Sequence, residues 1–180
     1  MRDPWPGSSM AVSTESFEIL RVLTRHRVDF IVVGMTAAVL QGAPAFTFDL
    51  DIVYRIAEDN VQSLLAALRE IGAEFRADAA NRRLSPNASH LMSDGHKLLK
   101  TKFGLLDVLG TIEERTRYED LASDVVTLDV DGVSVQALGL ERLIEAKQRA
   151  GRPKDMAVLP LLRSTLALIR AGTASAEKPT

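Results

Sequence analysis

The segment from Phe48 to Val53 constrains the fold more than any other part of the chain. It reads Phe-Asp-Leu-Asp-Ile-Val. In a β-strand, residues i and i+2 point to the same face, so Asp49 and Asp51 lie side by side, roughly 7 Å apart at Cα. Two carboxylates on one face of an apolar strand repel each other unless a cation lies between them. Mg²⁺ suits this position, because it binds carboxylates together with substrate phosphates.

A third carboxylate strengthens the prediction of a metal site. Asp107 lies in the middle of the apolar run Leu105–Leu109, where a lone Asp is unfavourable by β-propensity and by burial. If this strand pairs beside Asp49 and Asp51, three carboxylates converge, and such a cluster can hold two metal ions about 4 Å apart. Asp107 would then act as a base or as a base-like ligand. The alternative is an acidic, solvent-facing strand without a role.

Composition excludes several classes of function. The formal net charge of −2 provides no global basic field for tight nucleic-acid binding. The absence of cysteine excludes disulfides, thiolate nucleophiles and Cys-ligated zinc, and it is compatible with a cytoplasmic protein. The most apolar stretch, residues 30–40, is too short to span a membrane, so we expect no membrane partner.

The chain predicts one domain with short flanking segments. We expect a disordered leader over residues 1–12, with Met1 or Met10 as the natural start, a domain over 13–170 and a disordered tail over 171–180. The expected fold class is α/β (α+β), with a mixed β-sheet, packed helices and a C-terminal helical segment.

Periodicity and turn signals place the individual elements. Strands are predicted at residues 29–33, 48–54 and 105–109, and a hairpin joins 125–130 to 133–137 across Asp131-Gly132. Helices are predicted from residue 13 or 14, over 36–41, over 61–71 with Asn60 as N-cap, from 140 to a stop at Gly151, and over 153–170 with a kink or break at Pro160. Residues 79–97 are polar and predict a loop or a frayed hairpin. Within and after them, Lys97 and its basic neighbours predict a solvated segment.

Together these residues resemble the nucleotidyltransferase superfamily. The shared pattern is a strand with a glycine turn that opens a helix (Phe30–Ala38), an acidic pair (Thr47–Ile52) and a third acidic strand around Asp107. The resemblance is strongest to AbiEii-type toxins and related minimal nucleotidyltransferases. Residues 42–51 match the Gly-Ala-Pro-x-x-Thr-x-Asp-x-Asp stretch of that branch, and residues 143–155 match its helix-Lys-Arg-x-Lys-Asp segment. The similarity covers about residues 28–168.

The resemblance implies transfer of a nucleoside monophosphate from an NTP to a tRNA or protein acceptor, with Mg²⁺ or Mn²⁺ as cofactor. It also implies a toxin with a cognate antitoxin. Backbone amides at a glycine turn would bind the triphosphate, and cationic side chains would neutralise its charge. The implied nucleotide-binding residues are Gly34, Met35, Thr47, Lys147, Arg152, Lys154 and Asp155, of which Asp155 binds Lys147 or caps the next helix.

Two departures from the family pattern keep other hypotheses open. Met35 stands where the family has Gly or Ser, and Ala45 stands where this branch often has Arg. The first alternative is therefore a catalytically inactive, antitoxin-like relative that binds a nucleotide or a partner without turnover. The second is a structural α/β domain whose acidic residues are incidental.

Overall fold

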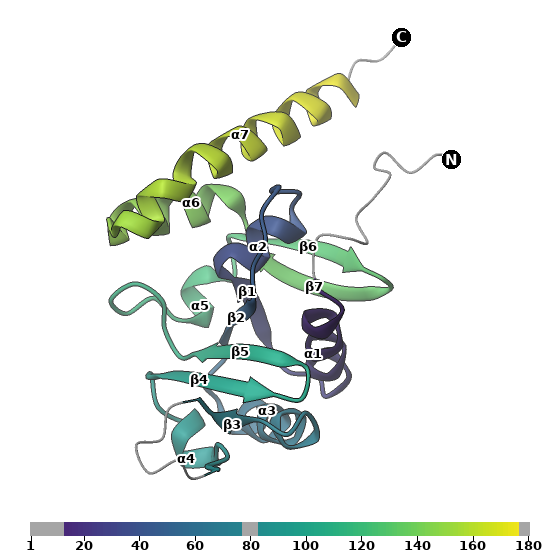
Figure 1. Ribbon diagram of the computed structural model, residues 1–180, viewed down its shortest axis with the longest axis vertical. Coiled ribbons are helices and arrows are strands. Elements are labelled where there is room, and N and C mark those ends of the chain that lie inside the picture. Colours follow the sequence, from purple (N-terminus) through teal and green to yellow (C-terminus); the bar gives the residue numbers. More distant parts are fainter. Residues whose placement is uncertain (1–12, 77–82, 177–180) are drawn as a thin grey trace.

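A seven-stranded mixed sheet forms the centre of the chain, as the computed structural model shows for residues 13–76 and 83–176 (Figure 1). The strand order is β3-β4-β5-β2-β1-β7-β6. The predicted leader lies outside the described residues, as does the end of the predicted tail. The predicted mixed sheet with packed helices is confirmed.

The elements follow one another closely along the chain. The helices are α1 (Thr14–Arg25), α2 (Gly34–Leu40), α3 (Glu58–Glu70), α4 (Ala88–Leu91), α5 (Tyr118–Leu121), α6 (Leu140–Ala150) and α7 (Pro153–Ala176). The strands are β1 (Phe30–Val33), β2 (Asp49–Tyr54), β3 (Glu74–Phe75), β4 (His96–Thr101), β5 (Gly104–Leu109), β6 (Val125–Val130) and β7 (Val133–Leu138).

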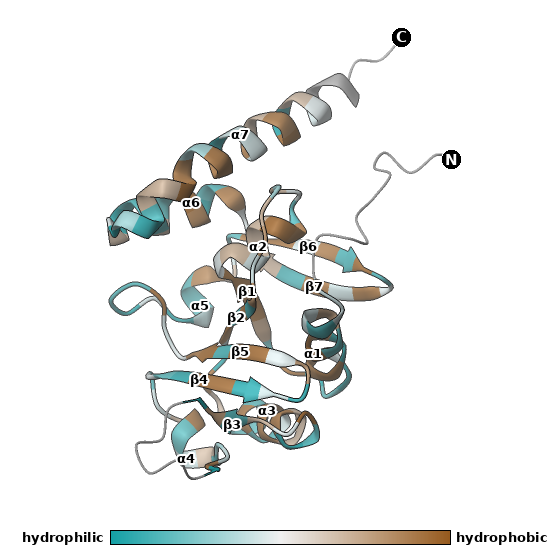
Figure 2. Ribbon diagram, in the orientation of Figure 1, coloured by the Kyte–Doolittle hydropathy of each residue, from teal (hydrophilic) through white to brown (hydrophobic). Residues whose placement is uncertain are grey.

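The middle of the sheet is its most apolar part (Figure 2). All four residues of β1 are buried, as are Leu50 and Ile52 of β2 and Leu106 and Val108 of β5. Strand β1 pairs antiparallel with β2, and β2 pairs parallel with β5. Burial of the apolar residues of β2 therefore leaves its alternate residues, the two aspartates, on the opposite face of the sheet.

Two predicted local features, a helix cap and a hairpin turn, are confirmed in detail. Ser13 caps α1, because its Oγ accepts a hydrogen bond of 3.1 Å from the Ser16 N–H. The β6–β7 hairpin turns at Asp131 and Gly132, whose φ angles are +49° and +81°. Two positive φ values in succession are what a two-residue type I′ turn requires.

Asn60 is not the N-cap of α3, because that helix begins at Glu58. Asn60 is instead buried within the first turn. Its amide oxygen accepts from the Asp29 N–H at 2.7 Å, and its amide nitrogen donates to the Asp29 and Arg55 carbonyls at 3.0 and 2.8 Å. The side chain thus connects the start of β1 to the end of β2, a use of Asn that local sequence patterns do not distinguish from a cap.

The predicted loop or frayed hairpin over residues 79–97 is only partly present: residues 83–87 have no helix or strand, but regular elements interrupt the rest of the described segment. Residues 88–91 form α4, and β4 begins at His96. The predicted elements also do not include the two-residue β3, the six-residue β4 or the four-residue α5. Lys97 is buried rather than solvated, with 4% of its surface exposed. The exposed face of β4 carries polar residues such as His96 and Lys100, and its buried face includes Lys97. The segment therefore lacks the apolar alternation that predicts a strand.

Helix α7 is continuous through Pro160 and extends to Ala176, past the predicted end at residue 170. Pro160 is exposed, and the carbonyl that it leaves without a partner belongs to the exposed Met156, where water can reach it. Figure 1 shows α7 lying over α6 with its C-terminal half extending beyond the rest of the domain. By length and composition alone, Pro153–Thr173 would be able to cross a membrane. Two of its leucines, Leu159 and Leu162, are buried in the core.

Candidate metal and nucleotide site

The pairing of β2 with β5 brings the three predicted carboxylates together. Asp51 is the register partner of Asp107, and Asp49 is the register partner of Leu105. One carboxylate oxygen from each of Asp49, Asp51 and Asp107 lies within 4.8 Å of the other two. The predicted convergence is therefore confirmed, and we call these three residues the acidic triad. Their role as metal ligands stays a prediction.

The pKa of the Asp51 carboxyl is strongly raised in this site. Burial, and next the negative charge of Asp49, raise its pKa from 3.8 to about 6. The positive charges of Lys147, Arg76 and Lys154 act in the opposite direction without cancelling the shift. The site therefore favours a positive species, either a proton or a metal ion, beside Asp51.

Gly34 brings the start of α2 against the acidic triad. Its φ angle is +64°, and a Cβ atom at this position would lie 2.1 Å from Asp51 Oδ2. Only glycine fits both the backbone conformation and this close approach. The next residue, Met35, is half-buried and packs against the hydrophobic core. The bulk that distinguishes Met35 from the family pattern thus contributes to core packing.

Two threonines hold the first residue of β2. The Thr36 hydroxyl donates to the Asp49 carbonyl at 2.9 Å. Thr47 Oγ1 lies 3.0 Å from the same carbonyl and 3.1 Å from Asp49 Oδ1. Thr47 therefore supports the acidic strand directly. Its role in binding a nucleotide stays a prediction.

Three of the four predicted residues at the α6–α7 junction, Lys147, Arg152 and Asp155, form a cluster of ion pairs. Asp155 is buried, with 2% of its surface exposed. It accepts from Lys147 Nζ at 3.0 Å and pairs with Arg152. Burial alone would raise the pKa of Asp155, but these hydrogen bonds outweigh it and hold the pKa below its usual value. Lys154 is exposed on the first turn of α7 and contributes positive potential at Asp51.

The sequence did not predict the ion pair of Arg76 with Asp107, nor the exposed aromatic side chains in the loop before β2. Arg76 follows β3 and forms an ion pair with Asp107. No local pattern links these two residues, because β4 lies between them in the sheet order. Phe46 and Phe48 flank Thr47 and are 93% and 88% exposed. Two phenylalanines this close to the acidic pair are visible in the sequence, but only the structure shows that both are exposed.

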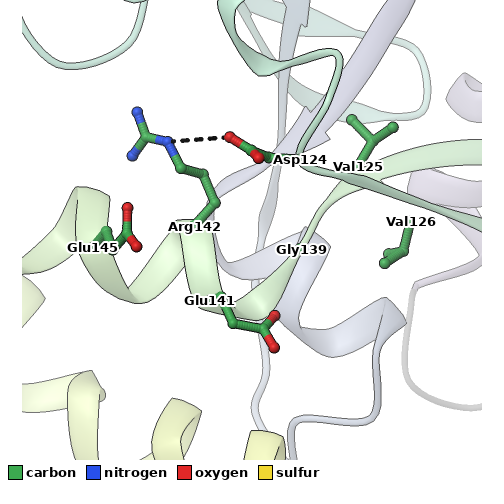
Figure 3. A pocket seen from close by; sticks show the side chains of 7 residues that line it. All are labelled: Asp124, Val125, Val126, Gly139, Glu141, Arg142 and Glu145. Carbon is green, nitrogen blue, oxygen red and sulfur yellow. Dashed lines mark ion pairs between the residues drawn. The ribbon is translucent and has the colours of Figure 1, made fainter.

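Figure 3 shows a pocket at the start of α6. Its lining residues come from the start of β6, from Asp124 before it, from Gly139 between β7 and α6, and from α6. No member of the acidic triad is among them. Glu141, Glu145 and Asp124 contribute negative charge, and Arg142 is paired with Asp124 at 3.7 Å. None of the predicted nucleotide-binding residues lines this pocket either, so it is not the predicted nucleotide site.

Comparison with known proteins identifies the fold. No family model and no curated protein matches the sequence. Among solved structures, the lincosamide antibiotic adenylyltransferase LnuA with bound lincomycin is 14% identical, covers 86% of this chain and 98% of its own, and has a TM-score of 0.58. ANT(2″)-Ia in complex with adenylyl-2″-tobramycin is 15% identical, covers 92% and 98%, and has a TM-score of 0.57.

A third similar structure is an antigenic nucleotidyltransferase-like protein from Paracoccidioides brasiliensis. It is 17% identical, covers 86% of this chain and 75% of its own, and has a TM-score of 0.51. At these identities the likeness concerns the fold. The predicted nucleotidyltransferase-like architecture is confirmed.

Proposed function

We propose that the chain is a metal-dependent nucleotidyltransferase, which moves a nucleoside monophosphate from an NTP to an acceptor. The observation that carries the proposal is the meeting of Asp49, Asp51 and Asp107 beside Gly34. The likeness in fold to solved nucleotidyltransferases supports it. An incidental acidic strand would not require a glycine whose backbone lies against one of the carboxylates.

The residues present fit a divalent cation of the Mg²⁺ or Mn²⁺ class. The acidic triad offers oxygen ligands only, which these hard cations prefer. Burial and the charge of Asp49 raise the pKa of Asp51, so neutralisation by a cation is favourable there. Asp49, Asp51 and Asp107 would hold the ion, which would supply charge neutralisation at the phosphates and activation of the acceptor.

The remaining chemistry belongs to the side chains of the protein. An acceptor oxygen forms a bond to the α-phosphorus of the NTP while the bond from that phosphorus to the bridging oxygen breaks, and pyrophosphate leaves. In our proposal Asp107 takes the proton of the acceptor hydroxyl. Lys147, Arg152 and Lys154 provide positive charge for the leaving pyrophosphate. Asp155 holds Lys147 and Arg152 in place.

The acceptor is the finer part of the proposal. A tRNA or protein acceptor, as in an AbiEii-type toxin with a cognate antitoxin, follows from the resemblance over residues 42–51 and 143–155. A small hydroxyl compound is the other candidate, because the similar solved structures carry lincomycin and adenylyl-2″-tobramycin. Each of these acceptors fits a protein that acts in the cytoplasm, where NTPs are available.

Label transfer from α-labelled NTPs tests the proposal. We would combine each of the four NTPs, Mg²⁺ and the full chain with total tRNA, a protein extract or an aminoglycoside and lincosamide panel. Asp49→Asn and Asp51→Asn should each reduce transfer on the order of 10³-fold, because they remove charge stabilisation of the transition state. Asp59→Asn is the matched control, since Asp59 is exposed and pairs with Arg55. Transfer that persists without metal, or in both triad variants, would contradict the proposal.

Two observations favour a second candidate, a nucleotide- or partner-binding relative without turnover. Ala45 lacks the arginine that the resemblance leads us to expect, and the Lys147 ammonium is already engaged by Asp155. This candidate predicts heat of binding with NTP and Mg²⁺ in a calorimeter but no labelled product with any acceptor. Product formation would exclude it.

A further inference from the structure

The two oxygens of the Asp107 carboxylate have different surroundings. Oδ1 is fully buried, and it faces a terminal guanidinium nitrogen of Arg76 that is buried as well. The Asp107 side chain nevertheless remains 14% exposed. Because Oδ1 is buried, that exposure belongs to the other atoms of the side chain.

Arg76 is fixed in place by the backbone of the neighbouring strand. Its N–H donates to the Leu98 carbonyl at 2.9 Å, and its Nε donates to the Leu99 carbonyl at 3.0 Å. Leu98 is the register partner of Asp107 in the β4–β5 pair. The guanidinium is therefore attached to β4 directly beside the carboxylate, and its planar fork has little freedom to leave.

We infer that Arg76 is a positioning residue for the metal site: it binds the buried oxygen of Asp107 and thereby directs the other oxygen toward Asp49 and Asp51. The inference rests on the proposed function, because it requires the acidic triad to bind a cation. Metal-ligating carboxylates are themselves hydrogen-bonded as a rule, and loss of such a partner weakens metal binding. Without Arg76, Asp107 would be free to rotate and would leave a buried oxygen without a partner.

The opposite effect of the same contact is repulsion between the guanidinium and an incoming cation. If repulsion were dominant, removal of Arg76 would strengthen metal binding. The charge of Arg76 also reaches Asp51, whose pKa it lowers. Orientation should dominate, because the ion pair with Asp107 already neutralises the guanidinium. The sign of the change in metal affinity therefore separates the two roles.

Mn²⁺ binding to the full chain without nucleotide, followed by electron paramagnetic resonance, tests the inference. Arg76→Gln should weaken Mn²⁺ affinity by about 10- to 100-fold. Arg76→Lys should lie between this variant and the wild type, because it keeps the charge but loses the planar fork. Arg55→Gln is the matched control: Arg55 is 29% exposed against 26% for Arg76, and it is also paired with carboxylates. It should retain wild-type affinity.

The outcomes separate the inference from the proposed function. A wild-type protein that binds no Mn²⁺ would contradict both. Wild-type binding together with equal or tighter binding by Arg76→Gln would overturn the inference alone. Circular dichroism and thermal melting monitor the fold of each variant. If Arg76→Gln does not fold, Arg76→Lys decides, and wild-type affinity in that variant would overturn the inference.

Discussion

Two charged residues of this molecule, the buried Lys97 and the half-buried Asp51, differ in how their surroundings stabilise their charge. The Lys97 ammonium donates to the Tyr54 hydroxyl at 3.0 Å and to the Gly95 carbonyl at 2.6 Å, and it also donates to the Ser93 carbonyl. Within residues 13–76 and 83–176, by contrast, no hydrogen-bond donor contacts the Asp51 carboxylate, and its nearest charged neighbours include another aspartate.

The difference separates a charge that the fold itself stabilises from one for which we propose a function. Burial lowers the pKa of Lys97 to about 8 and raises the pKa of Asp51 to about 6. The protein itself provides the acceptors that Lys97 needs. The ammonium connects β4 to the end of β2 and to the segment between α4 and β4. Asp51 lacks a comparable set of partners, and in our proposal a cation from outside stabilises its charge.

The largest expected effect comes from neutralising Asp51. Asp51→Asn should lose nearly all transfer activity, yet in the absence of metal it should melt at a higher temperature than the wild type near pH 7, because a buried like-charge pair is relieved. Activity assays and thermal melting in chelator would measure the two effects. A variant that is both less active and less stable would show that Asp51 stabilises the fold. In that case Asp51 and Lys97 would have the same structural role.

A methyl group at position 34 should disturb the acidic triad next most strongly. Gly34→Ala imposes a positive φ on a residue with a side chain and places Cβ 2.1 Å from Asp51 Oδ2. We expect a loss of about 3 kcal/mol in unfolding free energy, together with weakened Mn²⁺ binding.

The control for Gly34→Ala is Gly132→Ala in the β6–β7 turn. Gly132 also has a positive φ, but a Cβ there would meet no atom within 4 Å. This variant should lose about 1 kcal/mol and keep its Mn²⁺ affinity. Equal losses in denaturant unfolding would mean that the contact with Asp51 contributes nothing.

Lys97→Met should lower stability while leaving the acidic triad intact. The substitution keeps most of the side-chain volume but leaves the Tyr54 hydroxyl and two carbonyls without their donor, so we expect a loss of about 2 kcal/mol. Mn²⁺ affinity should remain that of the wild type. Weaker metal binding in this variant would place Lys97 in the functional region and break the comparison.

The smallest expected effects are the opposite pH dependences of the two residues. Because the folded state raises the pKa of Asp51 from 3.8 to about 6, it binds the proton more tightly than the unfolded chain, and stability decreases as pH rises through this window. Because the folded state lowers the pKa of Lys97 from 10.5 to about 8, stability increases as pH rises from about 8 to 10.5. Each contribution should be about 1 kcal/mol after allowance for solvent.

Difference curves isolate these two contributions from the other titrating groups. The unfolding free energy of metal-free wild type minus that of Asp51→Asn should change between pH 4 and 6 and be flat above that range. The corresponding difference for Lys97→Met should change only above about pH 8. Mn²⁺ affinity should also fall as pH drops below about 6, because the proton competes with the ion at Asp51. A flat profile for metal binding would contradict the assignment of the site to Asp51.

The sequence by itself determined the local parts of this protein. Alternation along residues 48–53 placed Asp49 and Asp51 on one face, and Asp131-Gly132 specified the hairpin. These features follow from backbone geometry, which acts between residues close in the chain. Only the tertiary structure decided which distant residues meet. The register that sets Asp51 opposite Asp107, the attachment of Arg76 to β4 and the burial of Lys97 depend on how strands far apart in sequence pack, and no local pattern encodes that choice.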